Sequence, residues 1–223
     1  MATIADNLQA VRARLAGTPE VTLLAVSKGH AVESVRQAVA AGQRAFGENY
    51  VQEALQKMEA LPGLEWHLIG PLQSNKTSEV AERFQWVQTI DREKIARRLS
   101  EQRPAEMAPL NVLIQVNVSA ESSKSGIKPH EAAPLCTAVA SMKNLRLRGL
   151  MAIPEPGAPR ARFHDIKVLF DQLKDRFGFD TLSVGMTDDM ALAIAEGSTM
   201  VRIGTAIFGK RGVGLRRNEE RAA

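Results

Sequence analysis

A lysine ends the first strongly apolar segment of the chain. The run LLAVSK begins at Leu23, finishes at Lys28 and is followed directly by Gly29. The pKa of an ordinary lysine amine is about 10.4, so only about one molecule in a few thousand is neutral at pH 7. Desolvation by apolar neighbours lowers this pKa and makes the amine a nucleophile that can form a Schiff base with a carbonyl group. Lys28 is therefore either a surface charge at a strand end or a reactive amine at the edge of a core.

A second group of residues, near the end of the chain, could bind a phosphate. Gly204 allows the backbone to approach an anion closely, and the hydroxyl of Thr205 adds a hydrogen-bond donor. Thr187, in the segment GMTDD, could supply another hydroxyl, and Ser183 a fourth contact. The alternative is that Gly204 only makes a turn and that Thr187 caps a helix. Because both segments carry such residues, we favour phosphate binding.

Eight β-prone apolar segments, joined by helical patterns, must position these residues. The expected strands cover residues 21–27, 44–48, 65–70, 84–91, 110–119, 145–153, 181–185 and 199–204. Strands this continuously apolar are typical of parallel sheets, and the count of eight predicts an α/β fold, a single (β/α)8 TIM barrel. A doubly wound open sheet is the alternative, but no strand is followed by a G-x-G-x-x-G loop. We expect one domain over residues 1–223, with an extra N-terminal helix over 1–16 and a C-terminal tail over about 211–223.

The barrel would gather the unusual residues at one end. Chemistry in such barrels takes place at the carboxyl ends of the strands, and phosphate usually binds after the last two strands. Lys28 follows the first strand, and Arg202 shares a face with Gly204 because the two are separated by one residue on a strand. A Schiff-base lysine beside a phosphate site suggests either a sugar phosphate substrate, as in class I aldolases, or pyridoxal 5′-phosphate (PLP).

The composition argues against several classes of protein. The net charge is +4, but the basic residues are dispersed, and no basic block predicts nucleic-acid binding. No apolar run is long enough for a bilayer span, and the first residues do not have the pattern of a signal sequence. Cys136 is the only cysteine, which excludes an internal disulfide and a multi-cysteine metal site. We expect a cytoplasmic monomer that binds no nucleic acid, membrane or metal, with Cys136 buried.

Six segments of the chain match a known family in sequence and in order. They are AVSK (25–28), FGENYVQEA (46–54), WHLIGPLQSNK (66–76), VNVSAESSKSGI (116–127), LRGLMAIP (147–154) and LSVGMTDDMALAIAEGSTMVRIGTAIFG (182–209). Together they closely resemble the pyridoxal phosphate homeostasis proteins, which are single-domain barrels similar to the N-terminal domain of alanine racemase. Because the resemblance covers nearly the whole chain with long motifs, it is highly specific.

The resemblance implies a PLP site and assigns residues to it. By carry-over, Lys28 holds the cofactor as an internal aldimine, Asn49 flanks the ring, and Arg202 faces the pyridine nitrogen. The implied phosphate contacts are Thr187, Gly204 and Thr205. The resemblance also implies partners, namely PLP itself and the PLP-dependent apoenzymes to which it would be delivered.

Three positions decide how closely the site of this chain follows the pattern of the family. The family usually has serine where this chain has Thr187, a change that keeps the hydroxyl. Family members often read SKTKP after the cofactor lysine, whereas this chain reads SKGHA, so that His30 replaces a second lysine. Lys124 matches a family lysine and is either a second cofactor contact or a solvated loop charge.

The residues argue against catalysis. PLP enzymes that use the ring as a strong electron sink place a carboxylate at the pyridine nitrogen, whereas Arg202 cannot accept that proton. A racemase needs two bases, and this chain lacks the second domain that carries the tyrosine base in alanine racemase. Its only tyrosine, Tyr50, follows the second strand, and His67 is interpreted as a structural histidine. We therefore predict a non-catalytic protein of PLP homeostasis; the alternatives are a PLP-dependent racemase or decarboxylase of low activity and a Schiff-base aldolase.

Overall fold

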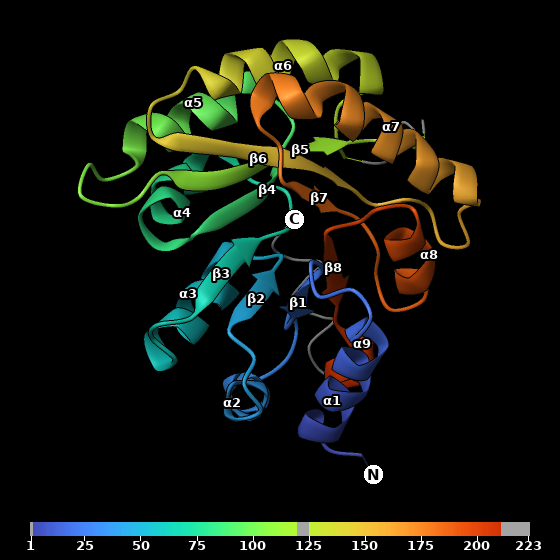
Figure 1. Ribbon diagram of the computed structural model, residues 1–223. Helices are drawn as coiled ribbons and strands as arrows, with labels where there is room; N and C mark the ends of the chain where they lie inside the picture. Colours follow the sequence, from blue (N-terminus) through green and yellow to red (C-terminus); the bar gives the residue numbers. More distant parts are fainter. Residues whose placement is uncertain (1, 120–124, 211–223) are drawn as a thin grey trace.

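The protein folds into a closed barrel of parallel strands surrounded by helices (Figure 1). The computed structural model describes residues 2–119 and 125–210. The strands are β1 Thr22–Val26, β2 Ala45–Glu48, β3 Glu65–Leu68, β4 Trp86–Ile90, β5 Leu110–Val116, β6 Leu145–Ala152, β7 Thr181–Ser183 and β8 Met200–Ile203. They pair in chain order, and β8 pairs with β1 to close the barrel. The predicted (β/α)8 barrel is thereby confirmed.

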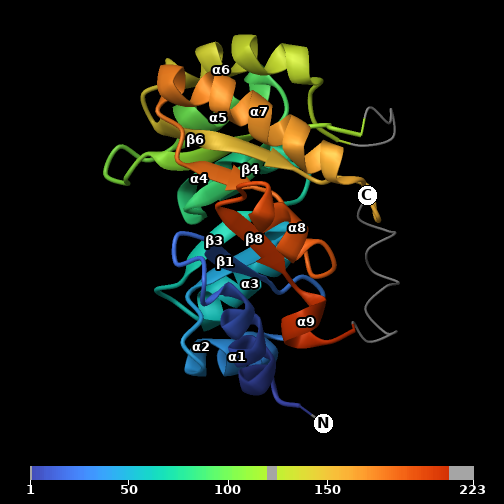
Figure 2. The same cartoon turned by 45° about the vertical axis from the view of Figure 1, so that its right-hand side comes forward.

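Helices cover the outside of the barrel (Figures 1 and 2). They are α1 Ile4–Leu15, α2 Val32–Ala40, α3 Val51–Ala60, α4 Thr77–Arg83, α5 Glu93–Gln102, α6 Ala132–Ala140, α7 Arg160–Phe177, α8 Met190–Ala195 and α9 Thr205–Phe208, with the 3₁₀ helices η1 Ser74–Lys76 and η2 Pro129–Glu131. Only α9, a single turn, and the 3₁₀ helices were not expected. None of the helices in the described ranges is long and apolar enough to cross a membrane. The expected C-terminal tail lies outside the described residues.

The extra N-terminal helix, α1, lies beside α9 in both views (Figures 1 and 2). Thr3 and Asp6 form a capping box that satisfies backbone N–H groups at the start of α1. Farther along α1, the side-chain amide of Asn7 donates to the carbonyl oxygen of Ile207 at 3.0 Å. The first helix therefore packs against the segment that follows the last strand.

Side chains alternate between the barrel interior and the layer beneath the helices. On β1, Leu24 and Val26 pack with Ile69 and Met200 inside the barrel. Ala25, between them, belongs instead to the main core that joins strands to helices. Alternation along each strand thus decides which residues can reach the mouth of the barrel at the carboxyl ends of the strands.

Candidate functional site

Lys28 lies just beyond the carboxyl end of β1, between β2 and β8. The register pairs Leu24 with Arg202 on β8 and Val26 with Gly47 on β2. Closure of the barrel therefore brings the first strand beside the last. Lys28 is half-buried and lies in the turn that begins two residues after β1 ends at Val26.

Asn49 follows β2 and borders a cavity of about 220 Å³ at the mouth of the barrel. Thr89 and Gln115 also line this cavity, and the Thr89 hydroxyl donates to the carbonyl oxygen of Gly70 at 2.8 Å. A Cβ atom on Gly70 would lie 2.1 Å from the carbonyl oxygen of Asn49, so this position requires glycine. The loops after β2 and β3 consequently pack backbone to backbone and hold Asn49 at the rim.

Arg202 is a buried guanidinium held by neutral groups. Its Nη1 donates to the carbonyl oxygen and to the Oγ of Ser183, both at 2.8 Å, and its Nη2 donates to the carbonyl oxygen of Ala152 at 2.9 Å. Burial lowers the pKa of Arg202 to about 10, and the more distant Asp189 acts in the opposite direction. Among the described residues no carboxylate forms an ion pair with Arg202, so its charge persists at neutral pH with no close counter-ion from that part of the chain.

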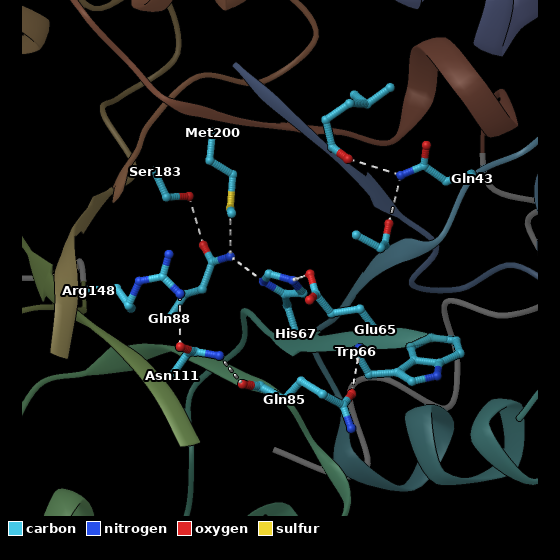
Figure 3. A network of polar contacts seen from close by, with 12 residues as sticks. Gln43, Glu65, Trp66, His67, Gln85, Gln88, Asn111, Arg148, Ser183 and Met200 are labelled. Atoms are coloured by element: carbon cyan, nitrogen blue, oxygen red, sulfur yellow. Dashed lines mark hydrogen bonds and ion pairs between the residues drawn. The ribbon is translucent and has the colours of Figure 1, made fainter. Parts of the chain in front are cut away.

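A chain of hydrogen bonds runs from Arg202 through the barrel interior, and Figure 3 shows most of it. The Ser183 hydroxyl donates to Oε1 of Gln88 at 2.7 Å, and Nε2 of Gln88 lies 2.9 Å from Nδ1 of His67. Nε2 of His67 lies 2.8 Å from Oε1 of Glu65, at the start of β3. Burial lowers the pKa of His67. A neutral ring that accepts from Gln88 and donates to Glu65 satisfies both nitrogens, as expected for a structural histidine.

The two loops predicted to bind phosphate follow neighbouring strands. Thr187 is half-buried in the loop between β7 and α8, where Asp189 occupies the N-cap position, so Thr187 is not the helix cap. Gly204 follows β8, and a Cβ atom there would lie 3.2 Å from the carbonyl oxygen of Val26. Thr205 is exposed in the first turn of α9. These placements leave both threonine side chains accessible at the mouth.

Of the two residues that bear on a second cofactor contact, the structure describes His30. The ring of His30 packs against the ring of Phe208 on α9, with centroids 5.1 Å apart. This contact joins the loop after β1 to the segment after β8. Lys124 lies outside the described residues.

A buried cluster beneath Lys28 was missed by the sequence analysis. Lys57 on α3 is buried, and its Nζ donates to the carbonyl oxygen of Ser27, to Oε1 of Glu48 and to Oε1 of Glu53, each at 2.7 Å. Burial raises the pKa of Glu48 to about 7, although the Lys57 ammonium acts in the opposite direction. One sequence signal was present, because Lys57 lies three residues after the buried Ala54 and so falls on the apolar face of α3.

Cys136 plays no part in this region. It is fully buried in α6, as expected from the sequence, and burial raises the pKa of its thiol to about 12. A thiol with so high a pKa is unreactive near neutral pH.

The closed barrel of eight parallel strands, with candidate site residues at the carboxyl ends of its strands, is shared with a known class of proteins. The model of the family described as "Alanine racemase, N-terminal domain" matches residues 1–212. An alanine racemase from Clostridium difficile 630 has the same fold, with a TM-score of 0.79 at 12% identity over 95% of this chain and 58% of that one. The chain is thus a barrel of the alanine racemase N-terminal type.

More similar proteins define the particular family. The pyridoxal phosphate homeostasis protein of Pseudomonas aeruginosa is 55% identical over 96% of this chain and 98% of its own length, and that of Escherichia coli K12 is 54% identical over 95% of each. PipY of Synechococcus elongatus, solved with PLP bound, has a TM-score of 0.83 at 35% identity over 93% of this chain and all of that one. This chain belongs to the family of the pyridoxal phosphate homeostasis proteins.

Proposed function

We propose that this protein binds PLP reversibly at the mouth of its barrel, with Lys28 as the covalent attachment point, and that it helps to control the level of unbound PLP. The observation that carries this proposal is the order of the strands. Because β1 lies between β8 and β2, the ends of these strands present Lys28, Arg202 and Asn49 to one mouth. The names of the relatives and the PLP-bound PipY structure support the same ligand.

The groups at the mouth fit PLP chemically. PLP supplies an aldehyde, which condenses with a primary amine with loss of water, and a phosphate group that is anionic at neutral pH. Lys28 supplies the amine, and Arg202 supplies a buried positive charge whose contacts among the described residues are neutral oxygens. An anionic ligand would compensate this charge, because a buried cation without a counter-ion is costly.

We assign the remaining residues to positioning and to the phosphate. Asn49 flanks the ring from the rim after β2, and Thr187, Gly204 and Thr205 bind the phosphate from the loops after β7 and β8. Ser183 was expected to contact the phosphate. Because its hydroxyl proton is directed to Gln88 and its oxygen accepts from Arg202, we propose that it acts by orienting Arg202.

We further propose that the protein turns over no substrate. A racemase or decarboxylase would need a base beside the bound group. Both ring nitrogens of His67 are already hydrogen-bonded inside the barrel. Tyr50 precedes α3 at its N-cap position and is 37% exposed, so it is not enclosed in the site. The geometry of the described residues therefore favours a carrier over an enzyme.

We also propose that the protein is a cytoplasmic monomer and that it delivers PLP to apoenzymes. Tyr50, Ile153 and Met186 are three of the four exposed large hydrophobic residues in the described ranges, and each follows a strand at the mouth. We propose that these aromatic and aliphatic side chains make transient contact with another protein. Sedimentation of the PLP-loaded protein alone measures its oligomeric state. Sedimentation of the same protein with an apoenzyme tests whether the two proteins associate.

The absorbance spectrum of the purified protein with added PLP tests the site. A visible band is expected in the wild type; borohydride, which reduces the C=N bond to a C–N bond, should abolish this band and leave PLP covalently attached to the Lys28 peptide. Both the band and the adduct should be lost in Lys28→Ala but not in the surface variant Lys76→Ala. A protein that stays colourless would contradict the proposal. Turnover of an amino acid that disappears in Lys28→Ala would show an enzyme instead, and an adduct formed only with a sugar phosphate would show an aldolase.

A further inference from the structure

The ammonium group of Lys57 is fully used within the protein. Its side chain is 3% exposed, and its Nζ makes three hydrogen bonds, which is the full donor capacity of a lysine. Lysines are almost never buried unless they are paired. A buried lysine with three oxygen partners therefore has a specific structural task, and its partners show what that task is.

All three partners lead to the residues on either side of Lys28, two of them through peptide groups and Glu48 through the Ser27 hydroxyl. Lys57 binds the carbonyl oxygen of Ser27 directly. Oε1 of Glu48 accepts from the Ser27 hydroxyl at 2.6 Å, and Oε1 of Glu53 accepts from the Gly29 N–H at 2.7 Å. The residue before Lys28 and the residue after it are thus attached to the same ammonium group.

The backbone at this point needs such support. The regular pairing of β1 ends at Val26, and Gly29 has a φ of 71°, in the left-handed region that favours glycine. Lys28 consequently lies where the strand has ended and the chain turns towards α2. Fixing the peptide groups on both sides of Lys28 sets the direction in which its side chain leaves the backbone.

We propose that Lys57, Glu48 and Glu53 form a buried clamp, here called the Lys57 clamp, that positions the Lys28 amine for PLP. The inference rests on the proposed function in that Lys28 carries PLP. Lys57 is a positioning residue, since its contacts are with Ser27, Glu48 and Glu53. By fixing the backbone on both sides of Lys28, the clamp reduces the entropy that is lost when the amine is held at the ring.

The first test uses the Lys57→Met variant and two measurements. We expect PLP to leave this variant about tenfold faster than it leaves the wild type, the size of effect typical of removing support behind a primary ligand. We also expect a shift of the visible band. In the protein without PLP, the amide of Gly29 should exchange its hydrogen about tenfold faster, while amides in β5, on the other side of the barrel, keep their protection. The matched control is Lys76→Met, which removes the lysine of a partly exposed pair with Glu79 far from Ser27 and Gly29 in sequence.

A second pair of variants keeps the test informative if Lys57→Met folds poorly. Glu53 is 25% exposed in its side chain, so it tolerates change better than Lys57. Glu53→Leu removes the acceptor of the Gly29 N–H, whereas Glu53→Gln keeps an oxygen there. We expect faster PLP release and faster Gly29 exchange in Glu53→Leu, with both restored towards wild type in Glu53→Gln.

The outcomes separate the clamp from the proposed function. If the wild type takes up no PLP, the proposed function fails, while hydrogen exchange at Gly29 still reports on the clamp. If the wild type binds PLP but release, band position and Gly29 exchange are unchanged in Lys57→Met and Glu53→Leu, the clamp is overturned. Faster exchange spread evenly over the whole barrel would also overturn it, because that result indicates global destabilisation.

Discussion

The two cationic residues at the mouth are held in opposite ways. Lys28 stands above the Lys57 clamp, whose ammonium and carboxylate groups compensate one another and act on the backbone beside it. Arg202 is held through its own guanidinium by the neutral oxygens of Ser183 and Ala152. The difference fits the role proposed for each residue. An amine must lose its proton to react, so the support acts through the backbone, whereas a guanidinium keeps its charge for the ligand.

Reversal of the charge of Arg202 should have the largest effect on stability. Arg202→Glu would place a buried carboxylate against the carbonyl oxygens of Ser183 and Ala152. We expect the free energy of unfolding to fall by about 3–5 kcal/mol, as for an uncompensated buried charge. Urea denaturation measures this loss, with Arg14→Glu, at an exposed position on α1, as the control. In any folded fraction loaded with PLP the visible band should shift, and an unchanged band would argue against Arg202 at the ring nitrogen.

The Lys57 clamp should respond to pH near neutrality, whereas Arg202 should not. The pKa of Glu48 is raised to about 7 in the fold, so the folded protein holds a proton that the unfolded chain releases near its ordinary value of 4.5. Stability contributed by this proton is complete below about pH 4.5 and is lost as the pH rises through 7, by no more than about 3 kcal/mol.

Denaturation between pH 5 and 8 checks this dependence. The decline with rising pH should flatten in Glu48→Gln and persist in Glu33→Gln, which changes an exposed acid on α2. A parallel decline in Glu48→Gln and the wild type would show that Glu48 does not titrate in this range. Arg202, with a pKa of about 10, contributes no slope over the same interval.

Removal of Gln88 from the middle of the hydrogen-bonded series Arg202–Ser183–Gln88–His67–Glu65 should lower the stability less. Gln88→Leu leaves the hydroxyl of Ser183 and Nδ1 of His67 without their partner, which should cost about 2 kcal/mol of unfolding free energy. Because Ser183 also accepts from Arg202, PLP binding should weaken as well. Thermal unfolding with and without PLP measures both effects. Gln52→Leu, on the exposed face of α3, is the control, and equal losses in the two variants would contradict the assignment.

The smallest loss of stability is expected at Glu65, the residue of the hydrogen-bonded series farthest from Arg202. Glu65→Gln keeps an oxygen for Nε2 of His67 and changes only the charge of a side chain that is 46% exposed. We expect a loss of less than about 1 kcal/mol, because interactions of exposed charges are weak. A larger loss in chemical denaturation would mean that the His67 ring depends on the Glu65 charge.

The sequence predicts the strands and the mouth residues because both depend on local patterns. Apolar runs mark the strands, and period-two alternation places Arg202 on the face of Gly204. The Lys57 clamp could not be predicted in this way, since it needs β1 beside β2 and α3 packed behind them. The hydrogen bond between Ser183 and Gln88 could not be predicted for the same reason, because the two residues are distant in sequence and become neighbours only when the barrel closes.

Pairing of β8 with β1 has a consequence for biosynthesis. Lys28 emerges from the ribosome early, but Arg202, Gly204 and Thr205 are among the last described residues to be made. At translation rates of about 5–20 residues per second, roughly 10–35 seconds separate the synthesis of Lys28 from that of Thr205. A nascent chain therefore carries Lys28 long before it has the other residues of the proposed site, and under the proposed function PLP would bind at this site only after translation.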